Sequence, residues 1–457
     1  MDGLLGDAMP LIEPRILKGF RDYLPEVMVP RVRLLRRIAE VFERFGFEPL
    51  DTPSIEYAEI LLGKLGPEAE KLFYRFQDNG GRDVALRYEL TISLARVVAQ
   101  YKDVPRPFKR YQMGPVWRAE SPARGRFREF WQCDVDVVGS HSLLADAECL
   151  AIDHAVMQAC GVRNYRIRFN NRKLFRGLQE KLGLQDSRAM DAVMRSVDKF
   201  DKIGEAGVKA ELQGLLGHGG FTEAGLAIVL DFLALGAREL RLDERVAALH
   251  AFVGGAEAGA RGCAELAEVL AYARKQGVPD SVLHIDPTIV RGLDYYTGTV
   301  FETFLTDVPG FGSVMSGGRY DGLIGLFSGE DVPAVGISVG IDRLISGLEE
   351  LKLLPPARSS AQALVALFNA EITPYALEVA GALRTGGINT EVWLEPGAKL
   401  QKQLKYASRK GIPLVLIAGP DEAAARRVTI KDMAKGSQEV VALEHAAAAA
   451  RTALAGS

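Results

Sequence analysis

The chain has 457 residues, of which 48% are hydrophobic and 25% are charged. This composition excludes intrinsic disorder, which needs low hydrophobicity together with high net charge. The 56 basic and 59 acidic residues nearly cancel, leaving a formal net charge of −3, so a nucleic-acid partner would have to be held by local basic patches. The length predicts about two to four domains.

The cysteines and the N-terminal segment indicate a compartment. No two of the four cysteines form a CxxC pair, so neither a zinc ribbon nor a thioredoxin-type site is predicted, and scattered thiols fit a reducing environment. The segment MDGLLGDAMPLIEPR carries acidic groups where a secretory signal needs a basic and then an apolar stretch. No uninterrupted apolar run is long enough to span a bilayer. We therefore expect a globular, cytoplasmic protein without membrane contact.

The first predicted elements are two helices and a hairpin. Apolar side chains that recur every three or four residues predict an amphipathic helix over residues 31–46. A second helix is predicted after Thr91. Residues 108–117 and 128–138 are predicted to be antiparallel strands. The long polar loop between them, AESPARGR, is a favoured kind of place for ligand contacts.

The middle of the chain changes character. A helix is predicted over about 143–159, followed by a strand at 165–169. Residues 172–280 are rich in Ala, Leu, Glu and Lys and have few β-branched runs, which predicts a helical insertion. Strand-like patterning resumes at Leu283 and again over 299–304.

A linker and a small domain are predicted at the C-terminal end. The sequence PPARSS (355–360) has the composition of a linker. Beyond it, strand-like segments at 363–368, 390–393 and 413–417 alternate with helical stretches. This alternation predicts a small α/β domain with parallel strands.

The predicted hairpin concentrates polar and aromatic side chains. Seven of them fall within fifteen residues: Arg118, Glu120, Arg124, Arg126, Arg128, Phe130 and Gln132. Alternate residues of a strand share one face, and on the second strand these are Arg128, Phe130, Gln132, Asp134 and Asp136. Arginine forks suit phosphate oxygens and a phenyl ring suits a flat base. The hairpin therefore indicates a phosphate site, with a solvated edge of unpaired charges as the alternative.

The segment RGLDYYTGTVFE (291–302) places an arginine, an aspartate and two tyrosines beside a predicted strand. Glycine next to Arg291 would allow the backbone to approach a ligand closely. The tyrosines, Tyr295 and Tyr296, have the alternative of being core aromatics. The segment is thus a second candidate for ligand contact.

In a third segment, AVGISVGIDRL (334–344), small residues alternate with apolar ones before Arg343. By itself the pattern indicates only a strand packed closely against a helix. The chain has neither a GxxxxGK[ST] loop nor a GxGxxG after a strand. If ATP binds, arginines and an antiparallel hairpin must hold it.

Together these segments resemble the class II aminoacyl-tRNA synthetases, and within them the histidyl-tRNA synthetase family. Similarity to class II motifs 1, 2 and 3 lies in FGFEPLDTPSIEY (45–57), YQMGPVWRAESPARGRFREFWQCDVDVVG (111–139) and AVGISVGIDRL. More selectively, RGLDYYTGTVFE and SGGRYDGL (316–323) are similar to the histidine-specific motifs, and LRYELT (86–91) to the amino-acid-binding strand. The segment 398–419 resembles the family's anticodon-binding domain.

The resemblance implies an α+β fold: a class II antiparallel sheet flanked by helices, with a helical insertion and a C-terminal α/β anticodon-binding domain. The catalytic domain would take residues 1–171 and 281–353, the insertion 172–280, and the anticodon-binding domain 361–457. The implied activity is ATP-dependent ligation of L-histidine to tRNA(His) through a histidyl-adenylate. The resemblance also implies a homodimer, with Mg²⁺ carried by ATP and no dedicated protein metal cluster.

For ATP, the resemblance implies one contact for each part of the nucleotide. Arg118 would hold the α-phosphate and act in catalysis, while Arg126 and Arg343 would lie by the β- and γ-phosphates. Phe130 would stack on adenine, and Glu120 would lie near its amino edge.

For histidine, the resemblance implies an ammonium site, an imidazole site and a catalytic arginine. The residues implied at the ammonium group are Glu89, Thr91 and Gln132. Those implied at the two imidazole nitrogens are Asp136 and Tyr296, and the pocket is lined by Tyr295 and Tyr320. Arg291 would bridge the substrate carboxylate and the α-phosphate, which makes it the expected catalytic arginine.

Two other functions fit a class II sequence. A non-catalytic paralogue that serves as regulatory subunit of ATP phosphoribosyltransferase usually lacks the anticodon-binding domain and the catalytic arginines, whereas this chain has Arg118, Arg291, Arg343 and a C-terminal segment. Another class II specificity, such as threonine or proline, is disfavoured by RGLDYYTGTVFE. The basic run Lys399, Lys402, Lys405, Arg409 and Lys410 would either meet tRNA or form a solvated helix face.

Overall fold

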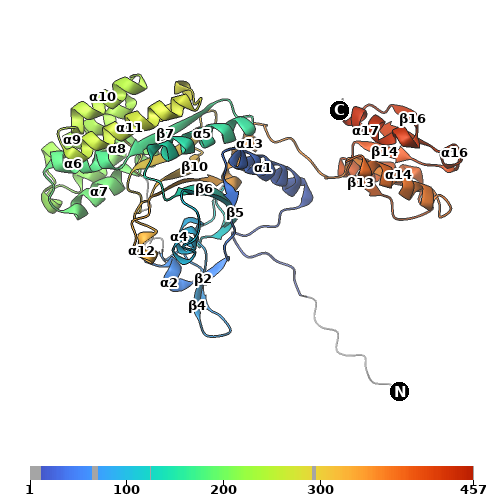
Figure 1. Cartoon of the computed structure of the whole chain (residues 1–457), viewed down its shortest axis with the longest axis horizontal. Helices are drawn as coiled ribbons and strands as arrows, with labels where there is room; N and C mark the ends of the chain where they lie inside the picture. The colour runs from blue at the N-terminus through green and yellow to red at the C-terminus, as the bar shows by residue number, and fades with distance from the viewer. Residues whose placement is uncertain (1–11, 64–69, 124, 291–294, 456–457) are drawn as a thin grey trace, which may run out of the picture. The chain divides into compact units, whose positions relative to one another are not determined.

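The computed structural model describes residues 12–63, 70–123, 125–290 and 295–455. The chain divides into two compact units. Figure 1 shows both, with the colour running from blue at the N-terminus to red at the C-terminus. The larger contains residues 36–353 and N-terminal residues up to 21, and the smaller contains residues 354–457 with residues 22–35.

An eight-stranded sheet forms the centre of the larger unit. Its strands, in spatial order, are β1 (Glu48–Pro49), β5 (Phe108–Trp117), β6 (Glu129–Val138), β11 (Ala334–Gly340), β10 (Ser313–Arg319), β9 (Thr299–Leu305), β7 (Tyr165–Asn171) and β8 (Leu283–Ile285). The inner pairings are all antiparallel, and only the outermost pairs, β1 with β5 and β7 with β8, are parallel. The predicted antiparallel sheet and its hairpin are confirmed.

Alternation along β6 divides the sheet into an apolar face and a polar face. Cys133, Val135 and Val137 are buried on the first, where α5 (Leu143–Ala159) and α13 (Ile341–Glu350) pack (Figure 1). The Ser142 hydroxyl caps α5 by accepting from the Leu144 N–H at 3.3 Å. The opposite face of β6 carries amide and carboxyl groups, and it forms the floor of the candidate site.

A small antiparallel sheet, which the sequence did not predict, leads into the second predicted helix. It consists of β2 (Ile55–Tyr57), β4 (Asp83–Leu86) and β3 (Arg75–Gln77), with the short helix α2 (Ala58–Leu61) beside it. From β4 the chain runs directly to α4 (Thr91–Gln100). This short connection, Arg87 to Leu90, places its side chains at the edge of the polar face.

The region predicted to be a helical insertion is helical. Between β7 and β8 lie α6 (Lys173–Leu182), α7 (Ser187–Val197), α8 (Phe200–Gln213), α9 (Glu223–Ala237), α10 (Leu242–Val253) and α11 (Glu257–Lys275). Arg245, which is only 4% exposed, joins two of these helices. Its guanidinium donates to the carbonyl oxygens of Leu235 and Arg238 at 2.5 and 2.7 Å. The unpaired carbonyls at the end of α9 are thereby satisfied.

The smaller unit is built on a five-stranded sheet. Parallel strands β13 (Thr390–Val392), β12 (Ala363–Ala366) and β14 (Leu414–Ile417) are followed by antiparallel β15 (Arg427–Asp432) and β16 (Gln438–Ala442). The helices are α14 (Thr373–Thr385), α15 (Leu400–Lys410), α16 (Pro420–Ala424) and α17 (Ala446–Ala455). The predicted α/β domain is thus confirmed in its parallel strands, while the antiparallel pair is an addition.

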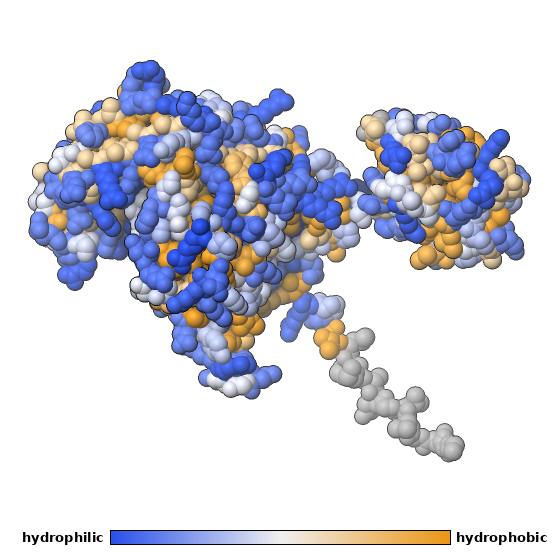
Figure 2. Space-filling view, viewed as in Figure 1, coloured by the Kyte–Doolittle hydropathy of each residue, from blue (hydrophilic) through white to orange (hydrophobic). Residues whose placement is uncertain are grey.

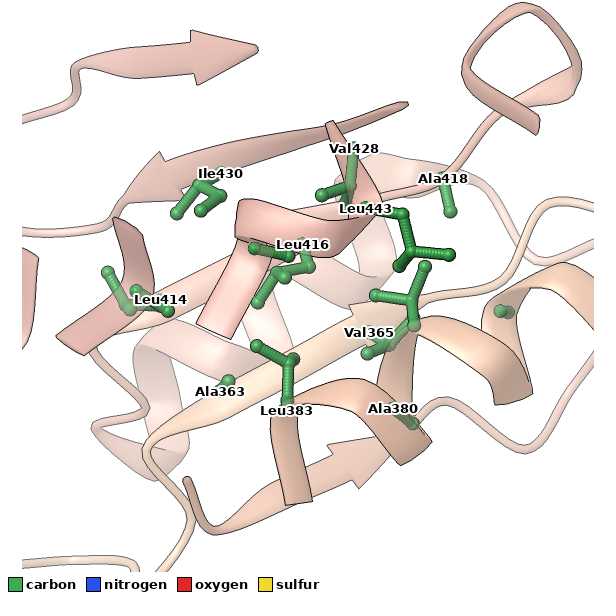
Figure 3. Packing of buried hydrophobic residues seen from close by; sticks show 14 of the residues in the cluster. Ala363, Val365, Ala380, Leu383, Leu414, Leu416, Ala418, Val428, Ile430 and Leu443 are labelled. Atoms are coloured by element: carbon green, nitrogen blue, oxygen red, sulfur yellow. The ribbon is translucent and has the colours of Figure 1, made fainter. Parts of the chain in front are cut away.

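The core of the smaller unit lies between its sheet and two helices. Figure 3 shows Val365, Leu414 and Leu416 of the sheet together with Leu383 of α14. All four side chains are fully buried, and each such residue contributes roughly 1.5–3 kcal/mol of transfer free energy.

Hydrophilic residues cover much of the visible surface of both units (Figure 2). In the described part of the chain, no helix combines the length and the apolarity needed to cross a membrane.

Candidate active site

A cavity of about 990 Å³ lies over the polar face of the large sheet. The resemblance gives thirteen residues a role at the site, and twelve of them line this cavity: Glu89, Thr91, Arg118, Glu120, Arg126, Phe130, Gln132, Asp136, Tyr295, Tyr296, Tyr320 and Arg343. They come from segments as far apart in the chain as α4 and α13. The thirteenth, Arg291, lies outside the described residues.

Arg118 occupies one part of the cavity, at the end of β5. Its guanidinium carbon lies 4.2 Å from the centre of the Tyr88 ring and 5.0 Å from that of Phe130, and its Nε donates to the Tyr88 carbonyl oxygen at 3.1 Å. Cation–π contact with two rings holds the planar group in one orientation. The remaining guanidinium donors can therefore bind an anion, and the Phe130 ring lies beside it.

Two more arginines border the cavity. Arg343, on α13, donates from Nη1 to the Ser313 carbonyl oxygen at 2.7 Å. Arg126, in the hairpin loop, lies 3.7 Å from the Glu120 carboxylate, and its side chain is 51% exposed. The Asp342 carboxylate accepts from the Trp131 N–H at 2.9 Å, which fixes the start of α13 against β6. Three guanidinium groups in the lining make the cavity suited to phosphates.

Glu89 is a buried carboxylate in the lining of the same cavity. Its two carboxylate oxygens accept from the N–H groups of Thr91 and Ile92, each at 2.6 Å. The carboxylate thus caps the N-terminus of α4, where the helix dipole favours negative charge. Burial raises the pKa of Glu89, and the two backbone hydrogen bonds oppose that rise.

Asp136 is the centre of a buried polar cluster. Its carboxylate lies 2.8 Å from Nη2 of Arg110, its cross-strand partner on β5, and both side chains are almost completely buried. The Tyr320 hydroxyl donates to the other carboxylate oxygen. Burial raises the pKa of Asp136, while Arg110 lowers it. A carboxylate held between a cation and a phenol has a fixed position from which it can accept a further hydrogen bond.

Three tyrosines form a wall beside Asp136. The ring centres of Tyr295 and Tyr296 are 4.9 Å apart, and those of Tyr295 and Tyr320 are 5.7 Å apart, all edge to face. The Tyr296 ring lies over Gly318, where an added Cβ would come within 2.9 Å of the ring. Glycine in SGGRYDGL therefore makes room for an aromatic residue of RGLDYYTGTVFE. The tyrosines line the cavity and also pack against one another, so the two interpretations of them, as ligand contacts and as core aromatics, are compatible.

Arg110 and Ser338 are site residues that the sequence analysis missed. Alternation over 108–117 places Arg110 on the same face as Gln112, a signal that was available. Ser338 accepts a hydrogen bond from Gln132 Nε2 at 2.7 Å. Arg168 of β7, also in the cavity lining, bonds Asp286 at 2.8 Å and Asp201 of α8 at 2.9 Å. Within the described ranges, no group of three or more His, Cys, Asp or Glu side chains is arranged to hold a metal ion.

Comparisons with known proteins identify the family of this chain. The family model described as "Histidyl-tRNA synthetase" matches residues 19–344, and that described as "Anticodon binding domain" matches residues 362–452. The chain is 43% identical to a histidine--tRNA ligase of Rhodopirellula baltica, over 95% of this chain and 97% of that one. It is also 43% identical to a histidine--tRNA ligase of Wolinella succinogenes, over 96% and 98%.

A solved structure gives the same result in three dimensions. The histidyl-tRNA synthetase of Nostoc sp. PCC 7120 superposes with a TM-score of 0.86 at 35% sequence identity, covering 97% of this chain and all of that one. Fold and sequence therefore agree, and the chain belongs to the histidyl-tRNA synthetase family.

Proposed function

We propose that this protein ligates L-histidine to tRNA(His), using ATP and passing through a histidyl-adenylate. The observation that carries the proposal is a single cavity lined by both guanidinium and carboxylate groups. The guanidinium groups are those of Arg118, Arg126 and Arg343, and the carboxylates include those of Glu89 and Asp136. A nucleotide triphosphate and a cationic amino acid are complementary to these charges.

In the first step, an oxygen of the histidine carboxylate attacks the α-phosphorus of ATP. The bond from that phosphorus to the bridging oxygen breaks, and pyrophosphate leaves. Two anions must meet, and negative charge spreads over the equatorial oxygens of the transition state, so positioning and fixed positive charge supply most of the catalysis. Arg118, Arg291 and Arg343 would supply that charge together with Mg²⁺ bound to ATP. In the second step, a ribose hydroxyl at the end of the tRNA attacks the carbonyl carbon, and AMP leaves.

The remaining contacts would select the substrates. Adenine would stack on Phe130 with Glu120 near its amino group, and Asp136 and Tyr296 would read the two imidazole nitrogens. A site built to bond both nitrogens rejects analogues that lack them, because buried polar groups would be left unpaired. The ammonium group would lie by Glu89, Thr91 and Gln132.

We also propose a domain assignment and an assembly. Residues 1–171 and 281–353 would be the catalytic domain, 172–280 the insertion and 361–457 the anticodon-binding domain. The protein would act as a cytoplasmic homodimer. On α15, Lys402 and Lys410 lie 2.7 and 2.6 Å from carboxylates of Glu395 and Glu391. The cations best suited to the tRNA backbone on this helix are therefore the others of the basic run.

The test is pyrophosphate exchange into ATP, run separately with each of the twenty amino acids. Exchange with histidine alone supports both adenylate formation and the imidazole pocket. Exchange with a different amino acid keeps the class II reaction but rejects the specificity. No exchange with any amino acid, on folded protein, would reject the ligase and favour the regulatory paralogue of ATP phosphoribosyltransferase.

A further inference from the structure

Two buried acceptor atoms lie on neighbouring positions of the same face of β6. They are Oε1 of Gln132 and Oδ1 of Asp134, and neither has a hydrogen-bond partner among the residues that the structure describes. The two residues are only 8% and 3% exposed, and both line the cavity. Buried polar atoms are almost always paired in folded proteins, so the two acceptors indicate a donor that the chain itself does not provide.

Ser338 fixes both side chains in place. Gln132 donates from Nε2 to the Ser338 oxygen at 2.7 Å, and the Ser338 hydroxyl hydrogen-bonds to the Asp134 carboxyl. Each side chain is thus held by one end, while the other end keeps an acceptor atom. A geometry fixed before binding lowers the entropy cost of binding.

The charges around Asp134 favour a cationic donor. Carboxyl groups face it from Asp136 on the same strand and from Glu89 before α4, and Arg110 faces it from β5. Arg87 lies farther along the same side and is hydrogen-bonded to backbone carbonyls. Tyr320 reaches this group through Asp136. In the described part of the site the fully buried Arg110 pairs with Asp136, and both Arg110 and Arg87 act on Asp134 without forming an ion pair with it.

Glu89 alone does not provide an acceptor for every proton of an ammonium group. Both of its oxygens already accept short bonds from the backbone of α4. An ammonium group has three N–H donors, whereas one acceptor site remains on each Glu89 oxygen, so at least one further acceptor is needed. Gln132 Oε1 and Asp134 Oδ1 are such acceptors, and they lie on the same wall of the cavity.

We propose that Asp134 is a substrate-contacting residue: its carboxylate and Gln132 Oε1 accept hydrogen bonds from the α-ammonium group of histidine. The proposal deepens the proposed function and rests on it. Burial raises the pKa of Asp134 to about 8 in the free protein, so near neutral pH the carboxyl is largely protonated before the substrate arrives. The ammonium cation favours the ionised form. Histidine binding therefore releases a proton from Asp134 to solvent.

The test uses calorimetric titration of the full-length protein with three probes. L-Histidine and L-histidinol carry the ammonium group, whereas 4-methylimidazole carries only the ring. Asp134→Asn should bind the first two roughly 10- to 100-fold more weakly, the range expected for one charge-assisted hydrogen bond, and should bind 4-methylimidazole as the wild type does. Equal affinity of wild type and variant for L-histidine, or equal loss for all three probes, would overturn the proposal.

Proton release gives a second measurement that needs no variant. L-Histidine is titrated at pH 7.5 into wild-type protein in two buffers of different ionisation enthalpy. The two apparent binding enthalpies should differ by the fraction of a proton released, multiplied by the difference between the ionisation enthalpies of the buffers. Equal apparent binding enthalpies in the two buffers would contradict the proposal, and this result does not depend on whether the variant folds.

The matched control is Asp153→Asn, which alters another fully buried carboxyl with a raised pKa on α5, outside the cavity lining. It should leave both the affinities and the proton release unchanged. If wild-type protein does not bind L-histidine at all, the proposed function itself fails; if it binds and Asp134→Asn is silent, only the present inference fails.

Discussion

Gly336 lies directly opposite Asp136 in the pairing of β11 with β6, and the Asp136 carboxyl occupies the space where a side chain at position 336 would stand. A Cβ atom added to Gly336 would come within 2.0 Å of Asp136 Oδ1 and 2.6 Å of the Val135 carbonyl oxygen. The glycine spacing of AVGISVGIDRL thus has a specific purpose, since it lets an acidic side chain from the next strand lie across the sheet.

Replacing Gly336 with alanine should therefore displace Asp136 and abolish histidine activation. We expect the histidine-dependent exchange rate to fall by roughly 100-fold or more, because an error of about 1 Å in the position of a contact is enough for such a loss. Pyrophosphate exchange measures the loss of activity, and thermal unfolding measures any change in stability. Gly381→Ala is the control: it lies in α14 with nothing within 4 Å of an added Cβ, so activity should persist and stability should rise by up to ~1 kcal/mol. Full activity of Gly336→Ala would contradict the assigned place of Asp136.

Arg118→Lys should lower the rate of adenylate formation although it keeps the charge. The guanidinium lies between the Tyr88 and Phe130 rings and donates to the Tyr88 carbonyl, an arrangement that a point-like ammonium group does not reproduce. We expect a loss in kcat of about 10²–10³, as for removal of one transition-state donor. Single-turnover adenylate formation measures it, with Lys18→Arg as a charge-preserving exchange at an exposed position. Equal rates for Arg118→Lys and wild type would remove Arg118 from its role at the α-phosphate.

The parts of the fold that were predictable are those with a strong local pattern. The hairpin strands β5 and β6 alternate over ten residues each, and their bounds agree with the prediction to within a residue. The helices of 172–280 have a composition that favours helix over strand. The small sheet of β2, β3 and β4 was missed because strands of three or four residues carry too few side chains to display a period.

The site was predictable mainly through resemblance, and its long-range contacts were not. The Glu89 cap of α4 is a local contact that an acidic residue just before a predicted helix could have indicated, whereas no local pattern indicates that Arg110 pairs with Asp136, because that contact depends on the pairing of β5 with β6. Antiparallel strands β15 and β16 were missed for a related reason: RVTIKD and QEVVA are short, and only their pairing with β14 defines them. The place of Arg291 in the cavity stays a prediction.

Arg110→Met should destabilise the protein, and more so at high pH. Asp136 would lose its buried cation, and removing one partner of such a pair typically costs ~3–5 kcal/mol. Without Arg110, the folded-state pKa of Asp136 rises further above that of the unfolded chain. A group with a raised folded pKa contributes stability at low pH and loses it as the pH rises. Denaturant unfolding at pH 5.5 and 8 should therefore show the larger deficit at pH 8; a deficit that shrinks as pH rises would contradict the pairing.

Arg291→Ala should remove histidine activation while the protein stays folded. The expectation comes from RGLDYYTGTVFE, in which this arginine would join the substrate carboxylate to the α-phosphate as they react. A contact made mainly in the transition state lowers kcat and kcat/KM together when it is lost. Pyrophosphate exchange and circular dichroism provide the two readouts, with Arg176→Ala on α6 as a control for loss of an arginine outside the cavity lining. Unchanged exchange by Arg291→Ala would end the assigned catalytic role.

The stability of Asp153→Asn relative to the wild type should be greater at pH 8 than at pH 5. Asp153 is fully buried on α5, its Oδ2 accepts from the Thr303 hydroxyl at 2.9 Å, and burial raises its pKa from 3.8 to about 7. Between those values the folded state holds a proton that the unfolded state has released, so wild-type stability falls as the pH rises, by an amount on the order of a few kcal/mol. Above pH 7 the loss is complete. Asparagine has a similar shape and no charge, so the stability of the variant lacks this dependence on pH.

Urea denaturation at pH 5, 6, 7 and 8 measures the unfolding free energy of the variant and of the wild type. The variant's value minus the wild-type value should increase up to about pH 7 and then level off. If the difference in unfolding free energy is the same at all four pH values, Asp153 has the same pKa in the folded and unfolded protein, and burial does not disfavour its ionised form.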